Sequence, residues 1–269
     1  MIDTHSHLNF KAFKKDVGEV INRANQKGVK AIIIPGTDIS SSKKAVEIID
    51  RFSGCYAAVG IHPHHAQDEN LTVGSKLKDN LEKLVKNKKV IAVGEIGLDY
   101  FRYIKTRYSD NIITAEIKKK QKELLLLQLE LSQSHHLPVI IHCRDAFTDL
   151  LEIISSFKHK NKKLTGVFHC FSGTVSDLKK VVSMGFYVGF DGNITYGNKW
   201  GKIVAETPPD RLLLETDAPF LTPVPFRTTR NEPSYLPLVA RQVALFQGLP
   251  LKQTLKTTSA NARRLFQIP

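Results

Sequence analysis

Eight short runs of hydrophobic residues alternate along this chain with longer segments in which hydrophobic positions recur at helical spacing. The runs are nearly continuous in apolar character, which is typical of strands covered on both faces, as in a parallel sheet. They predict strands at residues 2–5, 29–37, 55–63, 90–99, 138–143, 165–171, 186–194 and 211–219.

The segments between the runs have the spacing and the end signals of helices. Serines that can cap a helix open the segment 41–50, and Gly28 and Gly185 stop the segments before them. We expect helices at 10–27, 41–50, 76–86, 117–134, 146–157, 176–184, 234–247 and 251–266. Because strand and helix alternate without a linker, the sequence predicts an α/β fold, a single (β/α)8 TIM-type barrel formed by residues 1–269 as one domain.

Polar residues that can bind metal ions stand at or just past the C-terminal ends of seven of these runs. In a parallel barrel those ends meet on one face, which carries the active site in enzymes of this architecture. The pattern therefore predicts the fold, the position of the site and metal dependence together. The residues are Asp3, His5, His7, His62, His64, Glu95, His142, His169, Asp191, Asn193 and Asp217.

The composition is that of a soluble globular protein. The chain has 269 residues, 42% of them hydrophobic, and about 250 residues are typical of one such barrel. No apolar stretch reaches the roughly 18 residues of a membrane span, and the N-terminus lacks the features of a signal peptide. Three cysteines, an odd and sparse set, fit a reducing compartment. We expect a cytoplasmic monomer without membrane contact.

The formal net charge of +13 favours polyanionic partners, because a cationic surface releases counterions from a phosphate backbone. Much of the excess is lysine in the runs 86–89, 118–120 and 158–163, which fit solvated helix or loop surface equally well. The charge thus gives weak support to DNA, with RNA as the alternative, as the partner.

His5 and His7 are the first candidate metal ligands. Residues i and i+2 of a strand project to the same side, so both imidazoles can reach one ion. Glu95 follows the apolar run 90–94, where an unpaired charge would be very costly, and its two oxygens can bridge two ions. The alternative for Glu95 is a structural salt bridge to an arginine such as Arg144.

His142 and His169 hold corresponding places on neighbouring predicted strands, and Asp217 completes the set on the last one. Taken singly, each histidine could equally be a hydrogen-bonded core residue. Four histidines, one glutamate and one aspartate are too many ligands for one four-coordinate ion and suit two. The mixed nitrogen and oxygen donors allow magnesium, manganese or zinc.

Glu95 and Asp217 also carry the predicted catalytic roles. Glu95 would hold both ions, and Asp217 could bind metal and accept a proton from the attacking water. Glu215, two residues before Asp217, is expected to orient a ligand histidine from a second layer. His62 is not predicted as a ligand, because six residues already suffice.

Contacts to the substrate are expected from the loops at 99–116 and 219–233, which follow strands of the predicted barrel. Ordinary loop packing is an equal alternative for the residues of these loops. The candidates for phosphate contacts are His64, Arg144 and Arg230, and the candidates for stacking on bases include Phe101, Tyr103 and Phe226.

Eight motifs run in order along nearly the whole chain. They are DTHSHL at 3–8, GIHPH at 60–64, VGEIGLDY at 93–100, PVIIHCRDA at 138–146, HCFSG at 169–173, LLLETDAP at 212–219, RNEPSYLP at 230–237 and NARRLF at 261–266. In these motifs the sequence closely resembles the TatD family of metal-dependent deoxyribonucleases, within the amidohydrolase superfamily. The resemblance implies a (β/α)8 barrel that hydrolyses phosphodiesters with two divalent ions. It also implies that His5, His7 and Asp217 bind one ion, that His142 and His169 bind the other, and that Glu95 bridges them.

We therefore expect a metal-dependent deoxyribonuclease in which a water activated by two ions attacks the phosphodiester. The resemblance suggests a 3′–5′ exonuclease acting on single-stranded DNA, whereas the residues themselves indicate only an anionic ester. One alternative is a metallohydrolase of another ester or amide, such as an aminoacyl-nucleic-acid deacylase. The other is a non-catalytic nucleic-acid-binding barrel, against which the complete set of candidate ligands argues, because a binding protein has no need for two ions.

Overall fold

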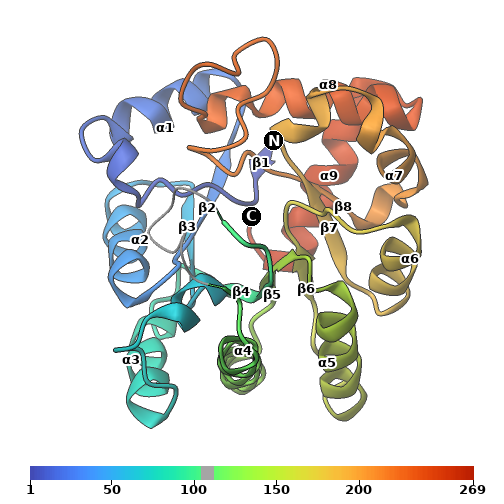
Figure 1. Ribbon diagram of the computed structural model, residues 1–269. Helices are drawn as coiled ribbons and strands as arrows, with labels where there is room; N and C mark the ends of the chain where they lie inside the picture. The colour runs from blue at the N-terminus through green and yellow to red at the C-terminus, as the bar shows by residue number, and fades with distance from the viewer. Residues whose placement is uncertain (104–111) are drawn as a thin grey trace.

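Eight strands form one parallel sheet, in the order in which they occur along the chain, with helices packed around it (Figure 1). This computed structural model describes residues 1–103 and 112–269, so part of the predicted loop 99–116 lies outside the described residues. The predicted (β/α)8 barrel is confirmed. The strands are β1 (Ile2–Asp3), β2 (Ala31–Pro35), β3 (Cys55–Val59), β4 (Val90–Asp99), β5 (Val139–Arg144), β6 (Gly166–Phe168), β7 (Tyr187–Phe190) and β8 (Leu212–Leu214).

The barrel closes where the chain beyond β8 runs beside the chain beyond β1. The backbone N–H of Asp217 donates to the carbonyl of His5 at 2.9 Å, and that of His7 donates to the carbonyl of Ala218 at 2.7 Å. These bonds continue the pattern of a parallel pair past the two short strands. The closing seam therefore places the first and the last candidate ligands of the sequence side by side.

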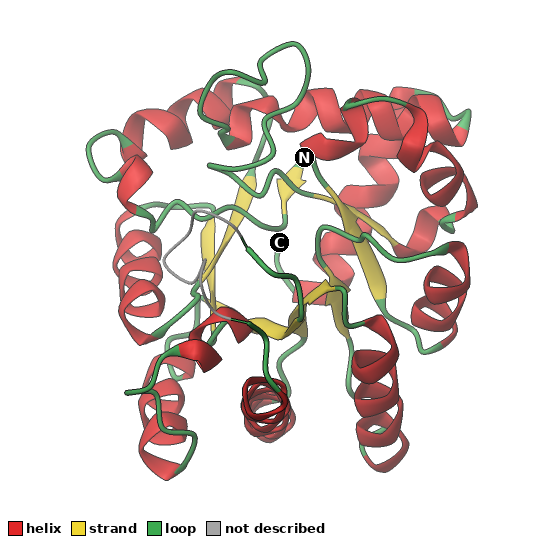
Figure 2. Cartoon of the chain, in the orientation of Figure 1, coloured by secondary structure: helices red, strands yellow, loops and turns green. Residues whose placement is uncertain are grey.

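The helices lie outside the sheet, between successive strands (Figure 2). All eight predicted helices are present, although the first is divided into a short 3-10 helix at Lys11–Phe13 and α1. The sequence pattern does not predict α7, because six residues are too few to show a helical period. The α-helices are α1 (Val17–Gln26), α2 (Ile39–Arg51), α3 (Ser75–Val85), α4 (Ala115–His135), α5 (Phe147–Lys160), α6 (Val175–Ser183), α7 (Gly201–Glu206), α8 (Leu236–Gln247) and α9 (Leu251–Phe266).

Within residues 1–103 and 112–269, none of the helices combines the length and the apolar character that crossing a membrane requires. That residues 1–269 form one domain stays a prediction.

Several strands end earlier than their hydrophobic runs predict. The backbone enters the left-handed region at Cys170 (φ 45°), directly after the candidate ligand His169, and at the candidate ligand Asp217 itself (φ 54°). Residues other than glycine adopt this conformation infrequently, and it is enriched at functional sites. The turns end the regular strands and direct the polar residues toward the C-terminal end of the barrel.

The hydrophobic core has an inner and an outer layer. Along β2, Ile33 belongs to the inner cluster, whereas Ile32 and Ile34 pack against the helices, as the two-residue period of a strand requires. Phe266 and Ile268, at the C-terminal end of the chain, join the inner cluster. Figure 1 shows the C-terminus at the centre of the barrel. The same cluster contains Ile2 and Ala31, the first residues of β1 and β2, so Phe266 and Ile268 lie toward the end of the barrel opposite the candidate ligands.

Two glutamines of α4 bind the backbone of the strands beneath them. The side-chain amide of Gln128 accepts from Ile61 N at 2.6 Å and donates to Ile61 O at 3.1 Å. Gln121 binds both backbone groups of Asp99 in the same way, each at 2.8 Å. Both glutamines are fully buried, so they fix the chain immediately before His62 and at the end of β4.

Replacing Gln128 with leucine should destabilise the protein by about 1–3 kcal/mol, because the two buried backbone groups of Ile61 lose their partner. Denaturant unfolding measures this change. Gln133→Leu is the matched control, since Gln133 is exposed on the same helix, and its free energy of unfolding should change by less than about 0.5 kcal/mol. Equal effects of the two substitutions would contradict the role of Gln128.

Candidate metal centre

A cavity of about 750 Å³ opens at the C-terminal ends of the strands. His7, Glu95, His142, His169 and Asp217 all line it, although they come from segments far apart in the sequence. His5, which is fully buried, lies directly beneath it in contact with these residues. The structure thus brings together the six residues that the sequence suggests as metal ligands.

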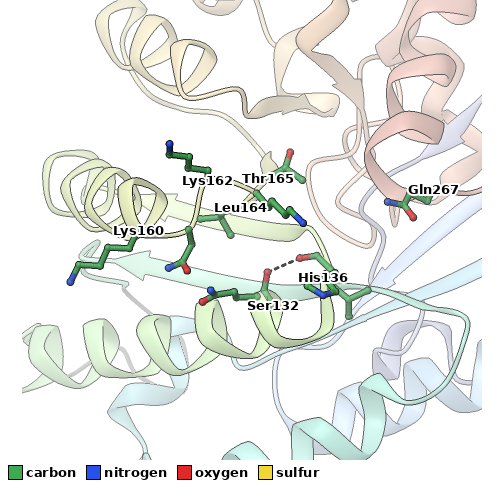
Figure 3. Close-up of a pocket in the computed structure, with 11 residues that line it drawn as sticks. Ser132, His136, Lys160, Lys162, Leu164, Thr165 and Gln267 are labelled. Carbon is green, nitrogen blue, oxygen red and sulfur yellow. Dashed lines mark hydrogen bonds between the residues drawn. The ribbon is translucent and has the colours of Figure 1, made fainter.

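A second hollow, of about 440 Å³, lies between the ends of α4, α5 and the C-terminal segment (Figure 3). Ser132 donates to the carbonyl of Leu137 at 2.6 Å in its floor, and Lys160 and Lys162 stand at its rim. Among the described residues that line it, His136 alone has a side chain that commonly binds metals. The positive charges of these lysines lie near the C-terminal end of α5, where free carbonyl groups carry partial negative charge, so the lysines have a structural role. The first cavity is therefore the candidate site.

The first group of donor atoms comes from the closing seam of the barrel and from β4. The Nε2 atoms of His5 and His7 lie 3.1 Å apart. Glu95 Oε2 lies 3.4 Å from the first of these nitrogens and 3.5 Å from the second. Asp217 Oδ1 lies 3.6 and 3.5 Å from the same two atoms. Each of the two carboxylate oxygens thus lies within 3.6 Å of both imidazole nitrogens, and such nitrogen and oxygen donors are those that divalent ions bind.

The second group lies at the ends of β5 and β6. His142 Nδ1 and His169 Nε2 lie 3.3 Å apart, and Glu95 Oε1 lies 3.0 Å from the first and 2.8 Å from the second. The ring of His169 also stacks on that of His5, with centroids 3.9 Å apart. The two donor groups are therefore packed directly against each other.

Glu95 faces the two groups with different oxygens, Oε2 toward His5 and His7 and Oε1 toward His142 and His169. Its side chain is 4% exposed. Burial opposes ionisation, but the neighbouring histidines, His169 foremost, hold the pKa of Glu95 well below its usual value. Each oxygen of this buried carboxylate thus faces its own pair of imidazole nitrogens. A carboxylate in this position can bridge two cations, so the residues present fit two divalent ions.

His62, which the sequence reasoning leaves out of the ligand set, also reaches the centre. Its Nε2 lies 3.4 Å from Glu95 Oε1, and it forms a possible donor group with Glu95 and His142. Burial lowers the pKa of His62 to about 3, so the imidazole is neutral and can offer a lone pair. Its position at the C-terminal end of the predicted strand 55–63 was the available signal, which the count of six ligands overrode.

Asp99 is a second residue that the sequence reasoning misses. Its Oδ2 lies 2.8 Å from His142 Nε2, the nitrogen that points away from Glu95. Asp99 is fully buried, and despite this burial, His142 and His64 keep its pKa below the usual value. A carboxylate behind a metal-binding imidazole fixes the orientation of the ring and raises its basicity. Burial opposes protonation of His142, but Asp99 and Glu95 together raise the pKa of His142 to about 10.

Glu215 lies behind the other histidine of the second group. Its Oε1 is 3.7 Å from His169 Nδ1 and accepts a hydrogen bond from Cys170 N at 2.5 Å. A Cβ at Gly189 would come within 2.3 Å of Glu215 Oε2, so only glycine leaves room for this carboxyl group. Burial raises the pKa of Glu215 well above its usual value. Its position suits the predicted second-layer role through the backbone of Cys170 more than through a direct bond to the imidazole.

Asp3, at the end of β1, has a structural place beside the centre. It accepts hydrogen bonds from Thr216 N at 3.0 Å and from Thr216 Oγ1 at 2.7 Å. Burial raises the pKa of Asp3 to about 7. These bonds tie β1 to the chain beyond β8 and support the closing seam.

His64 and Arg144, two of the three predicted phosphate contacts, line the cavity. The guanidinium of Arg144 lies over the rings of Phe101 and Tyr103, at 3.7 and 4.9 Å from their centroids. It also donates to the Tyr103 hydroxyl at 3.1 Å. His64 Nε2 lies 3.2 Å from Asp99 Oδ2. Arg144 is therefore a cation held in a fixed position at the rim of the centre.

Arg230, the third predicted phosphate contact, does not line this cavity. Its guanidinium pairs with both carboxylate oxygens of Asp16, at 3.0 and 2.6 Å, and lies over the ring of Phe13. These contacts join the loop after β8 to the segment before α1. The geometry argues against a substrate contact for Arg230, and we leave it out of the functional proposal.

Known proteins resemble the chain along its whole length. A family model described as TatD related DNase matches residues 2–267. An uncharacterized metal-dependent hydrolase, YabD, from Bacillus subtilis is 38% identical over 100% of this chain and 99% of its own. The 3′-5′ ssDNA/RNA exonuclease TatD from Erwinia tasmaniensis is 34% identical over 100% of both chains. The solved structure of YJJV, a TatD homolog from Escherichia coli, superposes with a TM-score of 0.87 at 29% identity, covering 100% of this chain and 98% of that one.

Asp99→Asn should weaken binding of one divalent ion by about 10–100-fold, because His142 loses the negative charge behind it. Calorimetric titration of chelator-treated protein with manganese measures both affinities. Asp145→Asn is the matched control, since Asp145 is an exposed carboxylate that lines the same cavity, and both affinities should stay within about twofold of wild type. Wild-type affinity in the Asp99 variant would refute the orienting role.

Proposed function

As the chain belongs to the TatD-related DNase family and is a metal-dependent hydrolase, we propose that it cleaves phosphodiester bonds in single-stranded DNA. In this proposal it removes nucleotides from the 3′ end and uses two divalent ions. The relatives named as 3′-5′ ssDNA/RNA exonucleases support the substrate and the direction. RNA is a further substrate to be tested.

The observation that carries the proposal is the bridging position of Glu95. Its two oxygens face two separate donor groups, one built on His5 and His7 and the other on His142 and His169. A single structural ion would not need a second set of ligands. Two adjacent ions are the arrangement suited to displacement at a phosphorus atom, where both the attacking and the leaving oxygen carry charge.

When bound, the two ions would polarise the phosphate and lower the pKa of an attacking water. The chain itself supplies the proton acceptor. Asp217 lines the cavity, and although burial opposes ionisation, His7 and His5 hold its pKa below the usual value. It is therefore a carboxylate near neutral pH and can take the proton that the attacking water loses.

Arg144 is the residue best placed to bind the phosphate beside the ions. Phe101 and Tyr103 hold its guanidinium at the cavity rim, so little side-chain entropy is lost when an anion binds. The net charge of +13 adds a general attraction for nucleic acid. A fixed cation beside two ion sites favours an anionic ester over a neutral one.

The proposal predicts that chelator-treated protein leaves 5′-labelled single-stranded DNA intact and that added magnesium, manganese or zinc restores progressive shortening. A matched oligonucleotide with a blocked 3′ end should resist digestion, because the proposed direction starts there. Denaturing electrophoresis resolves the products. Intact DNA with every ion would refute nuclease activity and favour esters or amides, such as aminoacylated nucleic acid, as substrates.

Glu95→Ala should lower the rate of DNA hydrolysis by at least about a hundredfold, because both donor groups lose their shared ligand. The metal-free variant should melt close to the metal-free wild type, whereas the rise in melting temperature on adding manganese should disappear. Glu19→Ala, at a carboxylate that is 77% exposed outside the cavity, is the control and should keep the wild-type rate. A wild-type rate in the Glu95 variant would rule out the two-ion site.

A further inference from the structure

Beyond the ions and the phosphate contact, we propose that Phe220 forms a stacking site for the terminal base of the substrate. This inference rests on the proposed function, and it assigns a part of the cavity that neither the ions nor Arg144 explain. The ligand it selects is a nucleotide whose phosphate lies at the metal centre and whose planar base lies on the ring of Phe220.

Phe220 lines the cavity three residues after Asp217. Its ring lies 6.3 Å from that of His7 and 6.2 Å from that of Phe10, with both contacts edge to face. His7 in turn stacks on Phe10 at 4.4 Å. The ring of Phe220 thus lies directly beside the candidate metal ligand His7. A nucleotide whose phosphate is bound at the ions would place its base near this ring.

The ring of Phe220 is exposed although its backbone is fixed. Phe220 is 50% exposed, whereas most large hydrophobic side chains of the chain are buried. The fully buried Asn231 donates to the carbonyls of Phe220 and Thr216 at 2.5 and 2.7 Å, and Phe220 N donates to Asp217 O at 2.9 Å. A fixed apolar surface open to water gains free energy when a planar ligand covers it, and little entropy is lost in ordering it.

The other aromatic rings named as base-stacking candidates have partners within the chain. Arg144 lies over Phe101 at 3.7 Å, and the hydroxyl of Tyr103 donates to Asp99 at 2.8 Å. Phe226 stacks on Tyr235 at 4.9 Å and is not among the residues that line the cavity. The sequence suggests these rings because they lie in the loops predicted at 99–116 and 219–233, but the contacts of the folded chain favour Phe220.

The ligand class follows from the two sides of the cavity. Arg144 and the metal centre select an anion, whereas Phe10 and Phe220 offer an apolar aromatic surface. A sugar phosphate without a base would leave that surface exposed. A nucleotide joins the two requirements in one molecule, and stacking tolerates any base because each has a flat face.

The test compares two single-stranded oligonucleotides that differ only at the 3′ end, one with thymidine and one with an abasic tetrahydrofuran unit. Wild-type protein should show a kcat/KM at least about fivefold higher for the thymidine end. Phe220→Leu should remove this preference by slowing the thymidine substrate alone, and Phe220→Tyr should restore it. Phe226→Leu, which removes an exposed ring from the same loop, should keep it.

No preference in the wild type, or the same preference in Phe220→Leu, would overturn the stacking site. Equal slowing of both substrates in Phe220→Leu would assign the ring to the support of His7, and would also overturn the stacking site.

A binding measurement separates failure of the stacking site from failure of the nuclease proposal. If no DNA is cleaved, manganese-loaded protein should still bind thymidine 5′-monophosphate at least about fivefold more tightly than 2-deoxyribose 5-phosphate, and only with an aromatic ring at position 220. Equal affinities would overturn the stacking site independently.

Discussion

The constraint on which the rest of this structure depends is the compensation of one buried carboxylate. Five imidazoles, those of His5, His7, His62, His142 and His169, lie within 3.5 Å of the oxygens of Glu95. Five neutral imidazoles cannot all donate hydrogen bonds to the two oxygens of Glu95 and also form hydrogen bonds with one another. A buried carboxylate whose charge is not compensated is very costly. Divalent cations held by these residues would resolve this conflict, because the carboxylate oxygens and the imidazole nitrogens would then face positive charge.

The scaffold holds these groups together through hydrogen bonds rather than ion pairs. The seam between β1 and β8 is made by backbone bonds, and Asp3 reinforces it through Thr216. On the other side, Gln121 and Gln128 hold the chain at Asp99 and Ile61. Such buried polar bonds are expensive to break, since a lone backbone group would remain away from water. Rigid supports of this kind keep several ligands in place before any ion binds.

The sequence predicts the strands and helices in which hydrophobic residues recur with a regular period. A hydrophobic run gives the strand and its end, and the parallel arrangement brings the polar ends together, so His5, Glu95 and Asp217 could be found from position alone. Asp99 is the last residue of β4 and also stands at a strand end, but the sequence reasoning takes Glu95 as the metal-binding residue of this strand, and the contact of Asp99 with His142 on the next strand appears only in the folded chain. His62 escapes for another reason, since a ligand count cannot say how many donors surround each ion.

The roles of the predicted phosphate-binding cations could not be read from the sequence, because they depend on which partner each side chain contacts. Arg144 and Arg230 are equivalent cations in the sequence, yet one lies on two rings at the cavity and the other pairs with Asp16. The net charge of +13 differs from these fixed contacts, because it acts over a distance of about 8 Å in physiological salt and attracts any polyanion. In the proposed function, capture of nucleic acid would therefore be diffuse, whereas selection would come from the few fixed groups around the cavity. Selectivity in this protein should accordingly change with single substitutions at the rim, while affinity for nucleic acid falls gradually as surface lysines are removed.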